Sequence, residues 1–145
     1  VTACDLRLDS RRPLRDVKSV SYLTHRLIGD AARRAGAFEA LALNEHDRLV
    51  EGSRSNIIVR LDGAWLTPPV QEGCLPGTVR RRLLESGAVT ERPIAAQEIT
   101  SIRSAALTNS LVGVLPIGQW DGRPLQIGSR LTELGRLVAN PWRQA

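Results

Sequence analysis

The most constraining feature of this 145-residue sequence is a series of short strand patterns between residues 38 and 67. Residues 38–43, 48–51, 56–61 and 64–67 carry the apolar and β-branched side chains typical of strands. An Asp-Gly pair separates the last two of these patterns, which is typical of a two-residue hairpin turn. The small, polar stretch 52–55 interrupts the series directly after a glutamate, Glu51. The sequence therefore predicts a meander of strands with a break beside Glu51.

Helical patterns flank this meander. Residues 17–36 place apolar side chains at helical spacing, with Asp16 as a candidate N-cap and Gly36 as a candidate stop. Lys18 would then lie in the first helical turn, at the rim of the buried face. The other expected elements are helices at 78–85, 95–102 and 129–138, and strands at 2–8, 88–93, 104–110 and 112–119.

Alternating strands and helices predict an α/β or mixed α+β fold built on a mixed, partly closed sheet. A hydrophobic content of 42% is enough for the packed core of one domain spanning residues 1–145. No apolar run approaches the roughly 20 residues needed to span a bilayer, and the N-terminus lacks a signal-peptide layout. Cys4 and Cys74 are too few and too far apart to suggest a disulfide framework or a zinc site. We therefore expect a cytoplasmic protein.

The formal net charge of +5 raises the question of nucleic acid. A dedicated binder concentrates its positive charge on one face and uses aromatic residues for stacking on single strands. Here the arginines are spread along the chain, acids lie among them, and aromatic residues make up only 3%. This pattern disfavours nucleic acid and fits a basic surface that attracts an anionic small molecule.

Lys18 is unusual because the chain's 20 Lys and Arg residues comprise 19 arginines and this single lysine. Arginine stays charged, whereas lysine can act as a neutral amine and form Schiff bases. Composition alone leaves chance as an alternative explanation. Glu51, taken alone, fits a solvated strand residue as well as a functional carboxylate.

Lys18 and Glu51 gain meaning together, because pyridoxal phosphate chemistry needs a lysine and an acid that keeps the ring nitrogen protonated. Gly77, Thr78 and Val79 begin a helix, where backbone N–H groups favour a phosphate. Each feature also has an ordinary structural reading. Further candidates are Asn109 and Ser110 at a strand end and Tyr22 four residues after Lys18, whereas His25 and His46 are expected at the surface or a helix flank.

Six ordered segments give the sequence a resemblance to the fold-type IV pyridoxal-phosphate enzymes, the class IV aminotransferases. They cover 17–23, 39–44, 50–57, 66–69, 75–80 and 107–110. The resemblance implies that Lys18 forms the Schiff base and shuttles the Cα proton, and that Glu51 binds the pyridine nitrogen. It implies that the backbone amides of Thr78 and Val79, beside Gly77, contact the phosphate, with Asn109 and Ser110 on its other side. Tyr22 would contact the cofactor as well, although the spacing between lysine and tyrosine differs among members of the family. Val79 and Ser21 depart from the family pattern, which often has Thr and Asn there.

Within that family, the segments 75–78 and 108–111 most resemble aminodeoxychorismate lyases. These convert 4-amino-4-deoxychorismate to 4-aminobenzoate and pyruvate in folate biosynthesis. A branched-chain or D-amino-acid aminotransferase is the alternative, since both use the same amine and electron sink. The resemblance also implies an amino-acid-like substrate, a homodimer, and a smaller N-terminal domain that this chain lacks, the chain matching the larger C-terminal domain. A non-catalytic remnant of the fold and a basic nucleic-acid-binding module are further alternatives.

Overall fold

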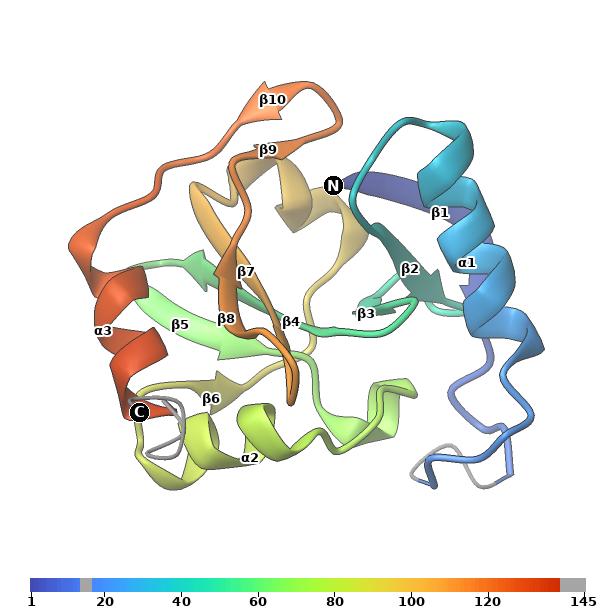
Figure 1. The fold of residues 1–145 in the computed structure, drawn as a ribbon, viewed down its shortest axis with the longest axis horizontal. Helices are drawn as coiled ribbons and strands as arrows, with labels where there is room; N and C mark the ends of the chain where they lie inside the picture. The colour runs from blue at the N-terminus through green and yellow to red at the C-terminus, as the bar shows by residue number, and fades with distance from the viewer. Residues whose placement is uncertain (14–16, 139–145) are drawn as a thin grey trace.

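The structure is a computed structural model that describes residues 1–13 and 17–138. A mixed β-sheet forms its centre, with helices packed around it (Figure 1). The helices are α1 (Leu23–Arg34), α2 (Thr78–Glu85) and α3 (Ser129–Leu137), with short 3₁₀ segments η1 (Val70–Glu72) and η2 (Ala96–Ser101). The strands are β1 (Thr2–Leu8), β2 (Ala40–Asn44), β3 (Leu49–Gly52), β4 (Asn56–Leu61), β5 (Ala64–Thr67), β6 (Thr90–Glu91), β7 (Ser104–Asn109), β8 (Gly113–Pro116), β9 (Gln119–Trp120) and β10 (Arg123–Pro124). The predicted mixed α+β class is confirmed.

Strand β4 is the centre of the sheet. One of its neighbours, β7, pairs with it antiparallel from Asn56 to Arg60. On the meander side, β3 pairs only at Asn56, and β5 pairs at residues 59–61. The sheet is mixed because β1 runs parallel to β2 and β6 parallel to β5, whereas the remaining pairs are antiparallel. This arrangement brings the ends of β3 and β7 together beside the first residue of β4.

The predicted hairpin between β4 and β5 is present and has the expected chemistry. Asp62 and Gly63 both have positive φ, 51° and 80°. Two successive residues with positive φ form the turn whose twist matches that of the flanking strands, and Asp-Gly pairs tolerate this conformation. The β-branched side chains of β4 are buried, as a central strand requires.

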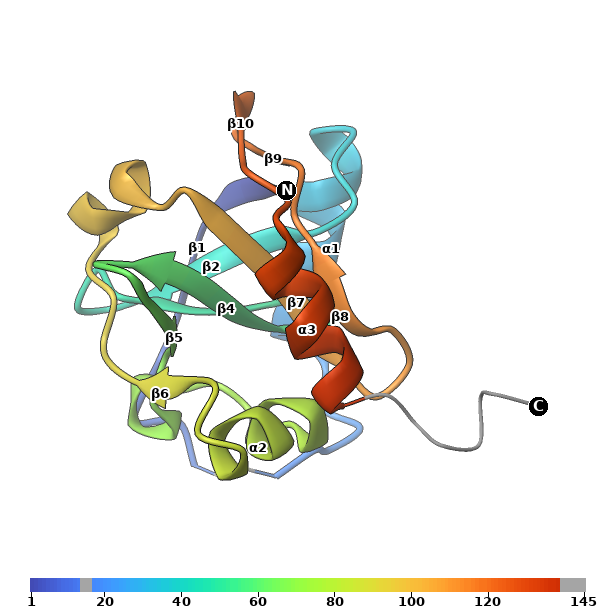
Figure 2. The ribbon, with the colours of Figure 1, turned by 90° about the vertical axis from the view of Figure 1, so that its left-hand side faces the viewer.

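Three clusters of buried apolar side chains hold the layers together. One, around Leu49, Ile57 and Leu107, is covered by η2 and the β9–β10 segment. A second lies between the sheet and helices α2 and α3, around Ile58, Leu83 and Leu134 (Figure 2). The third joins α1 to β1 and β2 through Ile28 and Ala32, together with the two buried free cysteines. Helix α1 therefore packs against β1 and β2, and helices α2 and α3 pack against the part of the sheet around β4.

The expected element bounds are corrected at several places. The helix expected from residue 17 begins at Leu23, and the candidate cap Asp16 lies outside the described residues. The strand expected at 38–43 begins at Ala40, and the one at 88–93 contracts to β6. The expected helix 95–102 is the 3₁₀ segment η2, and the strand 112–119 divides into β8 and β9.

The helix starts late because the residues just before Leu23 bury little surface within the described part of the chain. Val20 is fully exposed and Val17 is half exposed. Helical stability in proteins comes mainly from burying one face, so five exposed residues gain little by coiling. Instead, the Tyr22 amide donates to the Val20 carbonyl in a tight turn directly before α1.

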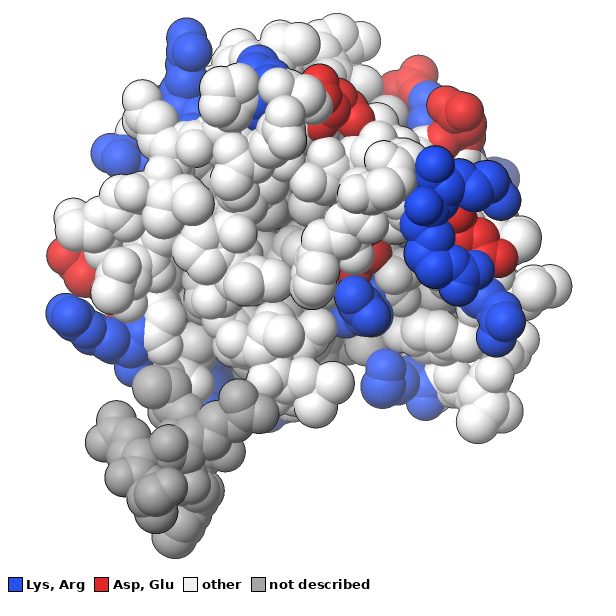
Figure 3. All heavy atoms as spheres, turned by 45° about the horizontal axis from the view of Figure 1, so that its top comes forward, with Lys and Arg blue, Asp and Glu red and all other residues white. Residues whose placement is uncertain are grey.

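The charged side chains are dispersed over the surface. Figure 3 shows lysine and arginine side chains at several separate places on one face, with acids among them. This dispersion agrees with the charge pattern of the sequence. Within the described residues, no helix is both long enough and apolar enough to cross a membrane.

Candidate active site

A pocket of about 530 Å³ opens between the segment before α1, the end of β3, the start of α2 and the end of β7. Seven of the eight predicted site residues line it: Lys18, Tyr22, Glu51, Gly77, Thr78, Asn109 and Ser110. Val79 does not, because its side chain is buried against Ile58 and Leu83 in the core. The structure therefore brings seven of the eight predicted residues together around one pocket.

Lys18 reaches the pocket from an irregular segment rather than from a helical turn. It lies five residues before α1, and its side chain is exposed. Its Nζ lies 3.3 Å from the Tyr22 hydroxyl and 4.9 Å from the centre of the Tyr22 ring. The predicted proximity of Lys18 and Tyr22 is thus present, although the predicted helical spacing that suggested it is wrong.

Glu51 is a buried carboxylate held by three hydrogen bonds from three different segments. Its Oε1 lies 3.1 Å from His25 Nε2 on α1. Its Oε2 accepts from Asn56 Nδ2 at 3.1 Å and from the backbone amide of Leu75 at 3.0 Å. Only 4% of the residue is exposed, yet it lines the pocket. The alternative that Glu51 is an ordinary solvated strand residue is therefore wrong.

Glu51 also differs from every other glutamate in the described part of the chain, because it has no arginine partner there. Arg12 lines a small adjoining cavity with it but forms no ion pair with it. The other glutamates each lie within 4.0 Å of an arginine, in the pairs Arg54–Glu39, Arg11–Glu45, Arg48–Glu72, Arg81–Glu85, Arg80–Glu91, Arg92–Glu98 and Arg130–Glu133. Among the described residues no arginine balances the negative charge of Glu51, so this charge is available to a bound group.

His25 was missed by the sequence analysis, which expected it at the surface. It is buried, with 6% of its surface exposed, and its ring stacks on Tyr22 with centroids 4.5 Å apart. The expectation failed because the buried face of α1 carries His25, Ile28 and Ala32, whereas the apolar residues Leu23 and Leu27 are exposed. His46 does lie at the surface, with 59% of its side chain exposed.

Asn56 is a second site residue that the sequence analysis did not single out. Its Nδ2 donates both to Glu51 and to the Leu75 carbonyl, the latter at 2.8 Å. Its Oδ1 packs so closely on Gly77 that a Cβ there would lie 2.1 Å from it. Gly77 has φ −64° and ψ 147°, which any residue adopts, so close packing rather than flexibility explains this glycine.

The N-terminus of α2 faces the same pocket. Gly77 is its N-cap and offers no side chain to the first helical amides, and Thr78 lines the cavity. Amides in the first turn have no acceptor within a helix, and together with the helix dipole they favour an anion. Thr108, also lining the pocket, has a buried hydroxyl with no hydrogen-bond partner among the described residues. Free amides and an orphan hydroxyl fit a phosphate group.

Asn109 closes this side of the pocket through its backbone, since its side chain is fully engaged. Its Oδ1 accepts from the amides of Leu111 and Val112, and its Nδ2 donates to the Arg54 carbonyl and the Ser55 hydroxyl. Those bonds fix the turn after β7, and with it exposed Ser110 at the pocket wall.

Comparisons with known proteins give a consistent picture. The family described as amino-transferase class IV matches residues 1–120. A branched-chain-amino-acid aminotransferase from Pseudomonas aeruginosa is 32% identical over 115 residues, which cover 76% of this chain and 37% of that protein. The chain therefore spans less than half the length of this relative.

Solved structures share the fold. A candidate 4-amino-4-deoxychorismate lyase from Legionella pneumophila superposes with a TM-score of 0.85 at 26% identity, over 95% of this chain and 55% of that one. A branched-chain aminotransferase from Thermoproteus uzoniensis gives a TM-score of 0.86 at 27% identity, over 94% of this chain and 49% of that one. Lyase and aminotransferase structures are thus about equally similar.

Proposed function

The chain belongs to the class IV aminotransferases, a family of pyridoxal-phosphate-dependent enzymes, and on that premise we propose that it carries the cofactor site of such an enzyme. The observation that supports this proposal is the meeting of three features in one pocket. These are the amine of Lys18, the carboxylate of Glu51 that has no arginine partner, and the open N-terminus of α2.

Each feature fits one part of pyridoxal phosphate. Its phosphate would bind the first amides of α2, at Thr78 and Val79, with the Thr108 hydroxyl and the backbone beside Ser110 on the other side. Its ring nitrogen would face Glu51. When bound, the cofactor supplies an electron sink that makes a substrate Cα–H bond acidic.

The protein's own residues then handle protons. Glu51 holds a proton on the ring nitrogen, because a buried carboxylate held by neutral donors favours a cationic neighbour. Lys18 takes the Cα proton from the substrate and delivers it later. It is the single lysine of the chain, and a lysine amine can become neutral whereas an arginine guanidinium stays charged. Tyr22, 3.3 Å from the amine, orients it.

For the overall reaction we propose elimination of pyruvate from 4-amino-4-deoxychorismate, which leaves 4-aminobenzoate for folate synthesis. The segment Thr108–Leu111 supports this choice, together with the likeness to the Legionella pneumophila structure. Lys18 would move the Cα proton to the departing enolpyruvyl carbon. Amino transfer is the second candidate, because the relatives named above include branched-chain aminotransferases.

The activity is proposed for a protein that includes this chain, because the chain spans 37% of the Pseudomonas aeruginosa relative. We propose that a second, smaller domain and a homodimer complete the pocket around Lys18, and that the protein acts in the cytoplasm. Support for a completed pocket comes from the exposure of Lys18, Thr78 and Ser110, which leaves one side of the cavity open.

Borohydride reduction tests the cofactor site. The full protein is incubated with pyridoxal phosphate, reduced, digested and mapped by mass spectrometry. Label on Lys18 is expected, and Lys18→Arg should lose it while keeping the positive charge. Label found elsewhere, with Lys18 unmodified, would overturn the proposal. A biological activity that survives Lys18→Ala would instead favour the non-catalytic remnant.

Two assays on the same preparation separate the candidate reactions. Release of 4-aminobenzoate from 4-amino-4-deoxychorismate reports the lyase. Transfer of an amino group from branched-chain or D-amino acids to 2-oxoglutarate reports the aminotransferase. Amino transfer that is fast in the absence of 4-aminobenzoate release would reject the lyase assignment.

A further inference from the structure

His25 connects the amine and acid sides of the pocket. Its ring stacks on Tyr22 at an interplanar angle of 23°, and the Tyr22 hydroxyl lies 3.3 Å from Lys18 Nζ. On its other edge, His25 Nε2 lies 3.1 Å from Glu51 Oε1. Because Tyr22 lies before α1 and Glu51 on β3, His25 joins two segments that are distant in sequence.

The surroundings of the imidazole define its protonation form. His25 Nδ1 is buried and has no hydrogen-bond partner among the described residues. A cationic imidazole would pair its charge with Glu51, but it would place a buried N–H at Nδ1 without an acceptor. A neutral ring with its proton on Nε2 leaves only an unfilled acceptor at Nδ1 and still donates to Glu51. The geometry therefore favours the neutral Nε2–H form.

We propose that His25 is a positioning residue that holds the Glu51 carboxylate toward the cofactor ring while leaving its negative charge uncompensated. The inference rests on the proposed function, because it gives Glu51 a cationic ring nitrogen to bind. A neutral donor restrains the carboxylate without competing for its charge, which an arginine would do. The other two donors, Asn56 Nδ2 and the Leu75 amide, are also neutral. All three bonds therefore serve the same purpose.

Two substitutions separate the hydrogen bond from the packing of the ring. His25→Phe keeps a flat ring against Tyr22 but removes the donor. His25→Gln places an amide N–H near the position of Nε2 and restores the donor without the ring. His46→Phe is the matched control, since His46 is the other histidine and lies outside the pocket.

The measured quantities are the visible absorption band of bound pyridoxal phosphate and its dissociation constant, both in the full protein. We expect His25→Phe to shift the band and to weaken binding about tenfold, the size expected for losing a hydrogen bond to a charged group. His25→Gln and His46→Phe should stay close to wild type. An unchanged band and affinity in His25→Phe, or equal losses in Phe and Gln, would overturn the proposal.

A second measurement needs neither a variant nor the cofactor. Nitrogen-15 NMR of histidine-labelled, cofactor-free protein at neutral pH distinguishes the two neutral tautomers from the cation. We expect the Nε2–H tautomer for His25, and either the Nδ1–H tautomer or the cation overturns the proposal. A wild-type protein that shows this tautomer but binds no pyridoxal phosphate would instead refute the proposed function.

Discussion

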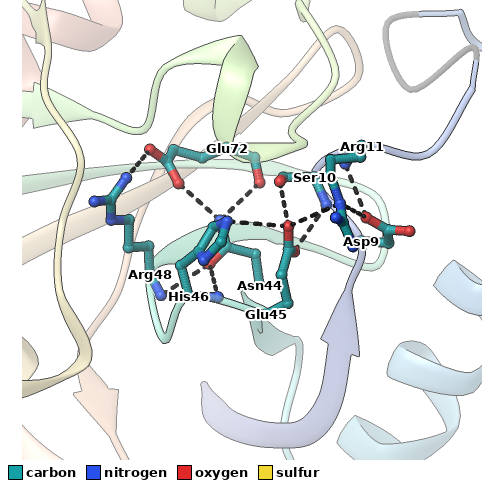
Figure 4. A network of polar contacts seen from close by, with 8 residues as sticks. All are labelled: Asp9, Ser10, Arg11, Asn44, Glu45, His46, Arg48 and Glu72. Carbon is teal, nitrogen blue, oxygen red and sulfur yellow. Dashed lines mark hydrogen bonds and ion pairs between the residues drawn. The ribbon is translucent and has the colours of Figure 1, made fainter.

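Glu51 and Glu72 are two buried carboxylates associated with the same β2–β3 hairpin, and they are held in opposite ways. Glu72 lies near the turn, where it accepts from Arg48 at 2.8 Å and from Asn44 Nδ2 at 2.7 Å (Figure 4). Glu51 lies at the far end of β3 and accepts only from a histidine, an amide side chain and a backbone amide. Of the two, only Glu51 lines the large pocket.

This difference separates structural acids from candidate functional ones. A carboxylate whose negative charge is balanced by an arginine contributes to stability, and its charge attracts a cationic ligand only weakly. The Glu72 cluster extends through Asn44 and His46 to Glu45 and Ser10, so it ties the turn to the loop that follows β1 (Figure 4). A carboxylate held by neutral donors has its position fixed and its charge available. The following predictions test this distinction, from the largest expected effect to the smallest.

Glu51→Gln should have the largest effect. It keeps the shape of the side chain but removes the negative charge that we propose faces the ring nitrogen, so kcat/KM of the full protein should fall about 100-fold or more. The measurement is steady-state kinetics with saturating pyridoxal phosphate, with near-UV circular dichroism to check folding. Full activity in a folded Glu51→Gln protein would contradict the role given to this charge.

Glu72→Gln should act on stability instead. It removes the negative charge from a part-buried, charge-assisted hydrogen bond with Arg48, so the free energy of unfolding should fall by about 1.5–3 kcal/mol. Urea unfolding measures this change, and activity per folded molecule should remain close to wild type. The matched control is Glu85→Gln, whose exposed pair with Arg81 contributes only about 0.3–0.5 kcal/mol. If Glu72→Gln instead abolished activity without loss of stability, the distinction would fail.

Gly77→Ala should disturb the Glu51 side through Asn56. The new Cβ would lie 2.1 Å from Asn56 Oδ1, so the amide must move, at a cost of about 1–3 kcal/mol in unfolding free energy. Gly135→Ala is the control, because nothing lies within 4 Å there and the change should stabilise α3 by about 0.5–1 kcal/mol. In an Asn56→Ser background, Gly77→Ala should cost much less. An unchanged cost in that background would reject the clash.

Ser10→Ala should have the smallest effect, and one that depends on pH. The Ser10 hydroxyl and then its amide hold the pKa of Glu45 at about 2, below its usual 4.5. A lowered folded pKa means that the stabilisation is complete above about pH 4.5 and is lost as the pH falls toward 2. The difference in urea midpoint between wild type and Ser10→Ala should therefore shrink over that range. A difference independent of pH would contradict the assignment.

The sequence predicted well what depends on local pattern. Strand periodicity and an Asp-Gly turn were enough for β4 and β5, and the position of Gly77 before a helical pattern was enough for the start of α2. The break after Glu51 was also visible, because Gly52–Ser55 carries no strand pattern. These features depend on residues that are neighbours along the chain.

The sequence did not predict what depends on tertiary packing. Apolar spacing extended α1 back to Val17, but within the described residues Val17 is half exposed and Val20 fully exposed, so the helix begins at Leu23. Tertiary packing also selects the helix face that is buried: it carries His25, whereas Leu23 and Leu27 are exposed, and His25 was consequently expected in the wrong environment. A signal did exist for Asn56, since it is a polar residue at the first position of an otherwise apolar strand.

The three hydrogen bonds to Glu51 also have a consequence for how the protein folds. They join segments separated by 26, 5 and 24 residues, so the binding pocket forms only after α1, β4 and the loop before α2 have all docked. Contacts of long sequence separation form slowly, because chain entropy must be lost first. Cofactor binding would thus be possible only after the last stage of folding. By mass action it would also stabilise the fully folded state relative to partly folded ones.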